Sequence, residues 1–431
     1  MSYQSCLEYL YGLQKYGIKL GLENIRTLLA RLDHPHDRYP ALHIGGTNGK
    51  GSTAAMAAAM LQAAGLRVGL YTSPHLIEFR ERIQVGGVPI SDAAVTDLTE
   101  RLRRTALADL NPTFFEFTTA LAFRYFAEMQ VEVAVIEVGM GGRFDATNVV
   151  TPLVTAITNV ALDHQAHLGE TIEAIAFEKA GIIKPSVPIV TGRLAPESLR
   201  VIERIVADRQ APWWRLGREF RTKGETTTGF AYRGPQLSVE GLTCPLAGAH
   251  QMDNAACALA LVEAGAPLGL RVPAAALQEG LRRVRWEGRL EVLEAHPHVV
   301  VDGAHNPAAA EAVAAYVRAY QRLHPGSRAI LVVGMMRDKD QRGFFDVVLP
   351  TADAVVLTQA TMPRAATVEE LRTAVTGRIE SVYAVPSPAE ALAIAKRLAT
   401  SEDLICITGS LMLVGELKAL ARGCEVSPIR G

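Results

Sequence analysis

The sequence predicts an α/β protein of two domains, a larger one with a mostly parallel sheet covered by helices on both faces and a smaller one of the same class. The chain has 431 residues, too many for one hydrophobic core. Short apolar strand-like runs alternate with amphipathic helix-like stretches in two separate series. A glycine-rich turn follows the first run and opens a helix, which is the setting of a phosphate-binding loop.

The first series extends from residue 40 to about residue 193 and predicts a parallel sheet. Its expected strands are residues 42–44, 67–71, 131–138, 154–159 and 188–191. Its expected helices are residues 52–64, 92–104, 116–129, 171–181 and 196–209. The first 39 residues look helical, with breaks at Gly17 and Gly21.

Residues 220–245 differ, because they are rich in Thr, Gly and alternating residues and predict antiparallel hairpins at a sheet edge. Helical patterns return at residues 253–263 and 273–283. A second α/β series begins near residue 289, which places a domain boundary at about residues 285–289. Its expected strands are residues 290–293 or 299–302, then 329–334, 354–358, 381–385 and 404–408, with helices between them such as 307–323 and 388–400.

Composition excludes several classes of protein. The net charge of −1 argues against a broad nucleic-acid or membrane surface. We see no leader peptide and no apolar run long enough to span a membrane. The five cysteines are odd in number, far apart and never in a C-x-x-C pair, so neither a disulfide framework nor a zinc site is expected. A reducing cytoplasm is the expected location.

The turn from Gly46 to Ser52 has the residues of a phosphate-binding loop. Its glycines let backbone N–H groups approach phosphate oxygens, and the helix that follows adds a partial positive charge. Lys50 supplies a full positive charge, and Ser52 offers a hydroxyl to Mg²⁺. The match to the common motif is imperfect, since Gly51 stands between Lys50 and Ser52. An ordinary glycine-rich turn is the alternative.

Glu137 ends the apolar run 133–137, where a parallel sheet places its ligands. An acid there, near a phosphate loop, is suited to hold the Mg²⁺ of a nucleotide. A helix-capping or solvated carboxylate is the alternative. The glycines of residues 139–142 also suggest a dinucleotide loop, but they fall short of G-x-G-x-x-G.

His164 follows the next strand and offers an imidazole to a metal, oriented by Asp163 or a backbone carbonyl, although a lone His is often structural. Lys179 ends a predicted helix, where a solvent-facing cation is favoured. The alternative is an amine that takes up CO₂ and becomes a carbamate, an oxygen ligand for a divalent ion. Only nine of the 44 basic residues are Lys, and Arg cannot be carboxylated.

Four residues nearer the second domain suggest contacts to a ribose or base. Asp302 and His305 lie where a predicted strand enters a turn, Arg289 lies on the linker, and Asn254 lies near the start of a predicted helix. Buried polar turn residues would look the same.

Taken together, these segments resemble the folylpolyglutamate synthase and dihydrofolate synthase family, within the Mur-type ATP-dependent amide ligases. The matching segments follow one another in order along nearly the whole chain: 43–52, 71–76, 115–116, 137–149, 163–164, 168–169, 178–182, 286–291, 302–307 and 338–340. Each is short, but the ordered set is specific. Gly45 and Phe144 stand where the family frequently has Ala and Leu, and neither change removes a functional group.

The resemblance implies an ATP-binding P-loop domain of the Mur ligase central type at residues 1–287 and a Rossmann-like ligase domain at residues 288–431. It implies that the ATP phosphates are bound by Gly46, Thr47, Asn48, Gly49, Lys50, Gly51 and Ser52. The nucleotide would also be contacted by Asn254, Arg289, Asp302 and His305. Two Mg²⁺ sites would use Ser52, Ser73, Glu137, His164 and carbamylated Lys179, and the resemblance leaves room for a monovalent cation such as K⁺. The residues expected to act in catalysis are Lys50, Lys179 and His164.

The implied reaction joins L-glutamate to a folate or pteroate carboxylate through an acyl phosphate, releasing ADP and phosphate. The expected partners are ATP, L-glutamate and a reduced folate or dihydropteroate, with no nucleic acid, no membrane and a monomeric enzyme. Rival readings are an ATP-hydrolysing switch, a nucleotide-dependent oxidoreductase based on residues 139–142, and a cell-wall precursor ligase. Whether the enzyme makes dihydrofolate, extends polyglutamate tails or does both is left open.

Overall fold

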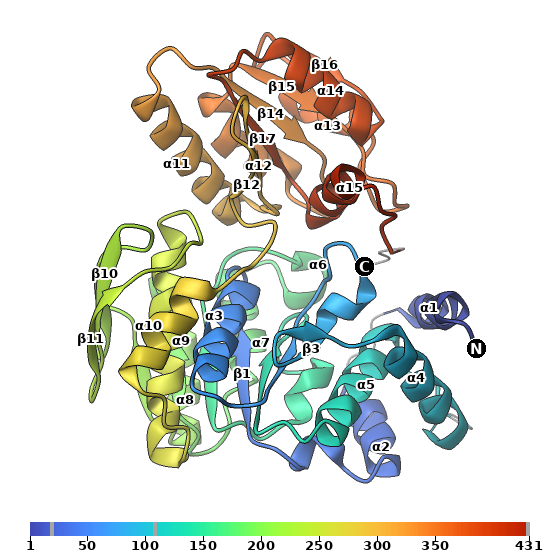
Figure 1. The fold of residues 1–431 in the computed structure, drawn as a ribbon, viewed down its shortest axis with the longest axis vertical. Helices are drawn as coiled ribbons and strands as arrows, with labels where there is room; N and C mark the ends of the chain where they lie inside the picture. The colour runs from blue at the N-terminus through green and yellow to red at the C-terminus, as the bar shows by residue number, and fades with distance from the viewer. Residues whose placement is uncertain (18–20, 107–109, 428–431) are drawn as a thin grey trace.

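The computed structural model describes residues 1–17, 21–106 and 110–427. Figure 1 shows two α/β bodies, one made by the N-terminal part of the chain (blue to yellow) and one by the C-terminal part (orange to red). The predicted two-domain α/β class is therefore confirmed. Among the described residues, no helix is long and apolar enough to cross a lipid bilayer.

The larger domain contains an eight-stranded sheet in the order β4-β3-β2-β5-β1-β6-β7-β8. Its strands are β1 (Ala41–Gly45), β2 (Val68–Tyr71), β3 (Ile83–Val85), β4 (Val88–Pro89), β5 (Val133–Glu137), β6 (Val154–Ile157), β7 (Ile189–Thr191) and β8 (Trp213–Arg215). Neighbours from β2 to β8 are parallel, and β3 and β4 add an antiparallel hairpin. All five predicted strands form, while β3, β4 and β8 were not predicted.

Side-chain alternation along the central strands explains why helices cover both faces. Leu42 and Ile44 pack on one face with α3, α9 and α10, whereas Ala41 belongs to the cluster of α1, α2, α4 and α5 on the other. A further cluster joins α7 and α8 to Ile157 and Ile189. The bounds are α1 (Tyr3–Gly12), α2 (Glu23–Arg31), α3 (Lys50–Ala63), α4 (Asp92–Ala106), α5 (Phe114–Glu128), α6 (Gln165–Leu168), α7 (Ile172–Ala180), α8 (Pro196–Arg209), α9 (His250–Gly265) and α10 (Ala274–Arg283).

The predicted hairpins form, but their predicted place at an edge of the main sheet is wrong. Strands β9 (Arg221–Glu225), β10 (Gly229–Arg233) and β11 (Ser238–Leu242) make a separate antiparallel sheet. Phe230 and Tyr232 of β10 are buried in the core cluster that contains α9. This sheet therefore covers helices rather than extending β4 or β8, as Figure 1 also shows beside α9 and α10.

The smaller domain has a six-stranded sheet in the order β12-β13-β17-β14-β15-β16, parallel except for β12. Both candidates for its first strand form, and they pair with each other. Its strands are β12 (Glu291–Glu294), β13 (His298–Val301), β14 (Ala329–Val333), β15 (Ala354–Leu357), β16 (Val382–Ala384) and β17 (Leu404–Thr408). Its helices are α11 (Pro307–Leu323), α12 (Gln341–Val348), α13 (Val368–Val375), α14 (Pro388–Leu398) and α15 (Leu411–Arg422).

The close packing of α10 on α3 yields a stability prediction. A Cβ atom at Gly280 would lie 2.4 Å from Met60 Cα and 2.6 Å from the Ala59 carbonyl oxygen, so the two helix backbones would have to separate. Gly280→Ala should lower the free energy of unfolding by about 1–3 kcal/mol, measured as a lower Tm. Gly12→Ala is the control, because among the described residues no atom beyond its chain neighbours and the nearby backbone of its own helix lies within 4 Å of a Cβ there. If Gly280→Ala had the same Tm as Gly12→Ala, this packing argument would be wrong.

Candidate functional site

The ends of four neighbouring strands bring most of the predicted residues together. The adjacent strands β2, β5, β1 and β6 are parallel, so their carboxyl ends lie at one edge of the sheet. Ser73 follows β2, Glu137 ends β5, the loop 46–52 follows β1, and His164 follows β6. The phosphate loop and the candidate metal ligands therefore meet at this edge.

The loop after β6 fixes the shape of the phosphate loop. The Thr47 and Asn48 N–H groups donate to the carbonyl and side-chain oxygens of Asn159, both over 3.0 Å. Thr158 Oγ1 donates to the Asn48 carbonyl over 2.6 Å, and Thr47 Oγ1 donates to the Ala161 carbonyl over 3.1 Å. These bonds hold the loop directly before α3, whose first residue is Lys50.

Steric constraints explain why this loop has glycine at two positions. Gly46 has φ +137°, and a Cβ there would lie 1.9 Å from Thr158 Oγ1. Gly49 has φ +81°, and its Cβ would lie 2.2 Å from Asn254 Oδ1. Both positions therefore demand glycine. The contact at Gly49 also shows that Asn254, on α9, reaches the phosphate loop.

Glu137 is a buried acid surrounded by cations. Its side chain accepts the Ser73 N–H over 3.0 Å, and the residue is 5% exposed. Burial raises the pKa of Glu137, while the charges of Lys50, Arg289 and Arg82 act in the opposite direction. The surplus of positive charge suits a polyphosphate.

His164 caps the short helix α6 with a left-handed backbone, φ 52°. Burial lowers the pKa of His164 to about 3, with a smaller opposing effect from Asp163. The imidazole is therefore neutral near pH 7, which is the form that binds a metal. The predicted orientation by Asp163 has weak geometric support, since His164 Nε2 lies 4.0 Å from Asp163 Oδ1.

Lys179 does not face solvent. It is 4% exposed, and its Nζ donates to the Gly46 carbonyl over 2.9 Å, so the reading of a solvated helix-end cation is wrong. In the part of the chain that the structure describes, no carboxylate lies within 4.0 Å of this amine. Burial, aided by the charge of Lys50, lowers the pKa of Lys179 to about 7.

The segment after β5 holds the helix that carries Lys179. The Arg143 N–H donates to the Glu178 carbonyl over 2.8 Å, and Asn148 Nδ2 donates to the Gly181 carbonyl over 3.1 Å. A Cβ at Gly142 would lie 2.8 Å from the carbonyl oxygens of both Glu178 and Lys179. This close contact with the helix explains Gly142, so this glycine does not indicate a dinucleotide-binding loop.

Of the residues predicted near the second domain, Asp302 stabilises a turn, whereas His305 and Arg289 act on groups of the large domain. Asp302 accepts the Leu290 and Ala304 N–H groups over 2.9 and 2.8 Å, so its carboxylate stabilises the turn after β13. His305 reaches the large domain, with Nε2 3.3 Å from Asp163 Oδ2. Arg289 Nη1 donates to its neighbour's carbonyl over 3.1 Å, and its charge also acts on Glu137.

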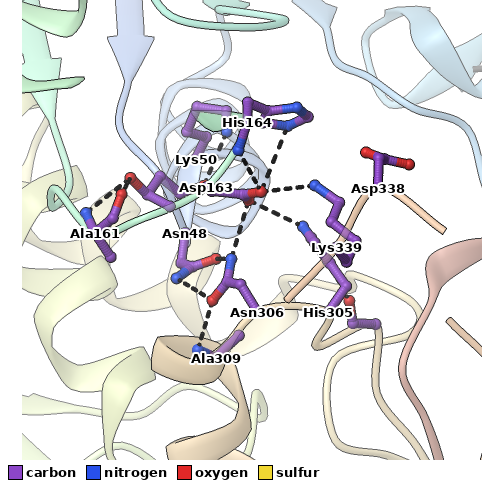
Figure 2. Close-up of polar contacts among 12 residues, drawn as sticks. Asn48, Lys50, Ala161, Asp163, His164, His305, Asn306, Ala309, Asp338 and Lys339 are labelled. Carbon is purple, nitrogen blue, oxygen red and sulfur yellow. Dashed lines mark hydrogen bonds and ion pairs between the residues drawn. The ribbon is translucent and has the colours of Figure 1, made fainter. Parts of the chain in front are cut away.

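The sequence did not assign Asn306 or Lys339 a role, yet both lie in the polar network of Figure 2. Asn306 and Lys339 each donate to Asp163. The available signals were an Asn-Pro pair at a helix start and a rare Lys in a chain rich in Arg.

The residues present fit a phosphate-bound Mg²⁺. Ser52 Oγ is buried and has no hydrogen-bond partner among the residues that the structure describes, so it is available as a ligand. With Ser73 and Glu137 it forms a set of hard oxygen donors. In the described residues, a group of His, Asp, Glu or Cys ligand atoms within 4.8 Å of one another occurs elsewhere, at His34, His36 and Asp37. That group precedes β1 and lies outside this site.

The chain is similar to known proteins along nearly its whole length. Residues 44–262 match the family model of the Mur ligase middle domain, and residues 288–411 match that of the Mur ligase glutamate ligase domain. The dihydrofolate synthase/folylpolyglutamate synthase of Bacillus subtilis is 37% identical over 97% of this chain and 98% of its own length. The structure of Escherichia coli FolC in complex with DHPP and ADP has a TM-score of 0.90 and 32% identity, covering 98% of both chains. The Yersinia pestis bifunctional folylpolyglutamate synthase/dihydrofolate synthase, complexed with AMPPNP and a Mn ion, has a TM-score of 0.88 and 30% identity, covering 98% of both chains.

Proposed function

The chain belongs to the folylpolyglutamate synthase and dihydrofolate synthase family of Mur ligases, and we propose that it uses ATP to join L-glutamate to the carboxylate of a folate or pteroate. The observation that carries the proposal is the meeting of a phosphate loop, a buried acid and a buried amine at the carboxyl edge of the large sheet. A ligase needs such a site beside a second domain that shields its reactive intermediate from water.

Each predicted residue has a role in this proposal. The loop 46–52 binds the ATP phosphates, with Lys50 as their cation. Ser52, Ser73, Glu137 and His164 hold one Mg²⁺, and carbamylated Lys179 lies at a second. Asn254, Arg289, Asp302 and His305 bind the rest of the nucleotide, directly or by holding the turn that does so. When bound, Mg²⁺ neutralises phosphate charge that would otherwise repel the attacking carboxylate.

The chemistry follows from the charges. The substrate carboxylate attacks the γ-phosphorus of ATP, the bond from that phosphorus to ADP breaks, and an acyl phosphate and ADP form. The positive end of α3 and Lys50 stabilise the charge that spreads over the transferring group. The neutral amine of L-glutamate then attacks the acyl carbon, phosphate leaves, and one proton is released. Separating these two attacks in time requires that water be kept from the acyl phosphate.

A reconstituted reaction tests the function. ATP and L-glutamate are mixed with dihydropteroate, tetrahydrofolate or its one-carbon forms, and both phosphate and the amide product are measured. We expect phosphate release to require the pterin substrate and to accompany amide formation. Release that ignores both co-substrates would instead support an ATP-hydrolysing switch. The same panel distinguishes dihydrofolate synthesis from tail extension.

Variants of Glu137 and His164 test the metal site. Glu137→Ala and His164→Ala should each raise the Mg²⁺ concentration for half-maximal activity about 10–100-fold, because each removes a ligand. Glu128→Ala is the control, since Glu128 pairs with Arg101 and Arg124 on the outer surface of α5. Mg²⁺ titrations that coincide with the wild type would contradict the assigned ligation.

Finer features also belong to the proposal. The number of divalent sites is two, a monovalent cation such as K⁺ is bound in addition, and the enzyme acts as a monomer without nucleic acid or membrane. The two domains divide at residues 287 and 288. All five cysteines carry free thiols, which supports a reducing cytoplasm as the location.

A further inference from the structure

Asp163 of the large domain contacts three residues of the small one (Figure 2). Lys339 Nζ donates to Asp163 Oδ1 over 2.6 Å. Asn306 Nδ2 donates to Asp163 Oδ2 over 3.0 Å, and His305 Nε2 lies 3.3 Å from the same oxygen. The side chains of Asp163 and Lys339 are only 7% and 8% exposed. Because both charges are shielded from water, replacing one of them by a neutral group leaves the other buried without a counter-charge, which is costlier than the loss of a surface ion pair.

Asn306 continues this contact to the phosphate loop. Its Nδ2 also donates to Asn48 Oδ1 over 3.0 Å, and Asn48 Nδ2 donates back to Asn306 Oδ1 over 3.3 Å. The same Asn306 oxygen accepts the Ala309 N–H over 2.8 Å and caps α11. One amide side chain therefore joins a helix of the small domain, the acid after β6 and the loop that faces the ATP phosphates.

An apolar contact joins the two domains at a second place. Leu76 and Ile77, just after Ser73, are buried in the core cluster of the small domain together with Leu413 and Val414 of α15. The Ile77 carbonyl accepts the Ser427 N–H over 2.9 Å. The small domain is thus anchored to the segment of Ser73 by packing and to the phosphate loop by polar contacts.

We propose that Lys339 and Asn306 are positioning residues that latch the small domain over the large one during the reaction, Lys339 through its ion pair with Asp163 and Asn306 through its link to Asn48. The inference rests on the proposed function for its chemical consequence. A latched arrangement keeps water from the acyl phosphate until glutamate attacks. An open arrangement of the domains admits water, which attacks the acyl phosphate, regenerates the carboxylate and releases phosphate. ATP is then hydrolysed and no amide forms.

The coupling between phosphate release and amide formation tests the latch. Lys339→Met should lower kcat about 10-fold or more, because domain closure is needed for the reaction. It should also raise the phosphate released per amide from about one to at least about three, because water then reaches the acyl phosphate. Lys339→Arg should restore most of the coupling, since it keeps a cation at the same place. Asn306→Ala should raise the KM for ATP as well, through its effect on Asn48. A simple loss of folded enzyme would lower both products together and leave their ratio unchanged.

Lys396→Met is the matched control, because Lys396 pairs with Glu294 in an exposed ion pair within the small domain. Small-angle scattering of each variant supplies a second readout, and Lys339→Met should increase the radius of gyration relative to the wild type and Lys396→Met. If Lys339→Met released about one phosphate per amide and had the radius of gyration of the wild type, the proposal would be overturned. If the wild-type protein forms no amide with any pterin or folate, the proposed function fails, and the scattering comparison still decides whether the ion pair holds the domains together.

Discussion

Lys179→Ala is expected to abolish amide formation, with a fall in kcat of about 10³-fold, as for the loss of a major electrostatic element of an active site. The amine lies inside the site, 2.9 Å from the Gly46 carbonyl, where it is 4% exposed. A carbamate there would convert a cation into an oxygen ligand for the proposed second Mg²⁺, and alanine supplies neither group. Bicarbonate or a short carboxylate such as acetate should partly restore the rate by filling the space left by the side chain.

The pH dependence of this lysine has a definite sign. CO₂ reacts with the neutral amine, and burial lowers the pKa of Lys179 from 10.5 to about 7. The reactive form is therefore abundant above pH 7 and is lost as the pH falls below it. Mass spectrometry of the intact protein at pH 8 with bicarbonate should detect the added CO₂, and acid should remove it.

Lys184→Ala is the control for both measurements. Burial also lowers the pKa of Lys184, to about 8, but its amine donates to the Asn148 carbonyl over 2.8 Å, outside the proposed site. We expect this variant to retain most of the activity and to gain nothing from added carboxylates. A Lys179→Ala enzyme with a rate near the wild type would remove the carbamate from the mechanism.

The carboxyl edge of the large sheet could be predicted because its signals are local. Apolar runs ending in Gly46, Glu137 or a residue near His164 follow from burial on both faces of a parallel sheet. The phosphate loop adds glycines at fixed places in the chain. Such patterns lie within ten residues of the side chains that they position, so a single sequence contains them.

The direction of Lys179 could not be predicted in the same way. Its position at a helix end favours solvent, whereas the core packing of α7 and the hydrogen bonds of the segment after β5 to Glu178 and Gly181 hold this helix beside the phosphate loop. The ion pair of Asp163 and Lys339 joins residues 176 positions apart, and the rarity of Lys in this chain does not say which partner Lys339 has. The strands of residues 220–245 show their period, but not which surface they will cover.

Lys50→Met is the second large expected effect, a fall in kcat/KM for ATP of about 10³-fold. Lys50 begins α3 and donates to the Thr47 carbonyl over 3.1 Å, so its ammonium lies beside the loop proposed to bind the ATP phosphates. The unbranched Met side chain keeps the packing while removing the charge. The γ-phosphoryl group would then transfer with one fewer cation to offset its charge, and initial rates at varied ATP concentrations measure the loss.

The charge of Lys50 also acts on the neighbouring Lys179. The pH profile of a Lys50 variant therefore distinguishes the loss of this charge from a change in the shape of the loop. This charge lowers the pKa of Lys179, so Lys50→Met should raise that pKa and shift the residual activity to higher pH. Lys50→Arg should leave the pH profile near the wild type but restore only part of the rate, because a planar guanidinium cannot replace a compact ammonium in a tight loop. If Lys50→Met lowered the rate without moving the pH profile, the lysine would act on the phosphates alone, and the proposed electrostatic link to Lys179 would be wrong.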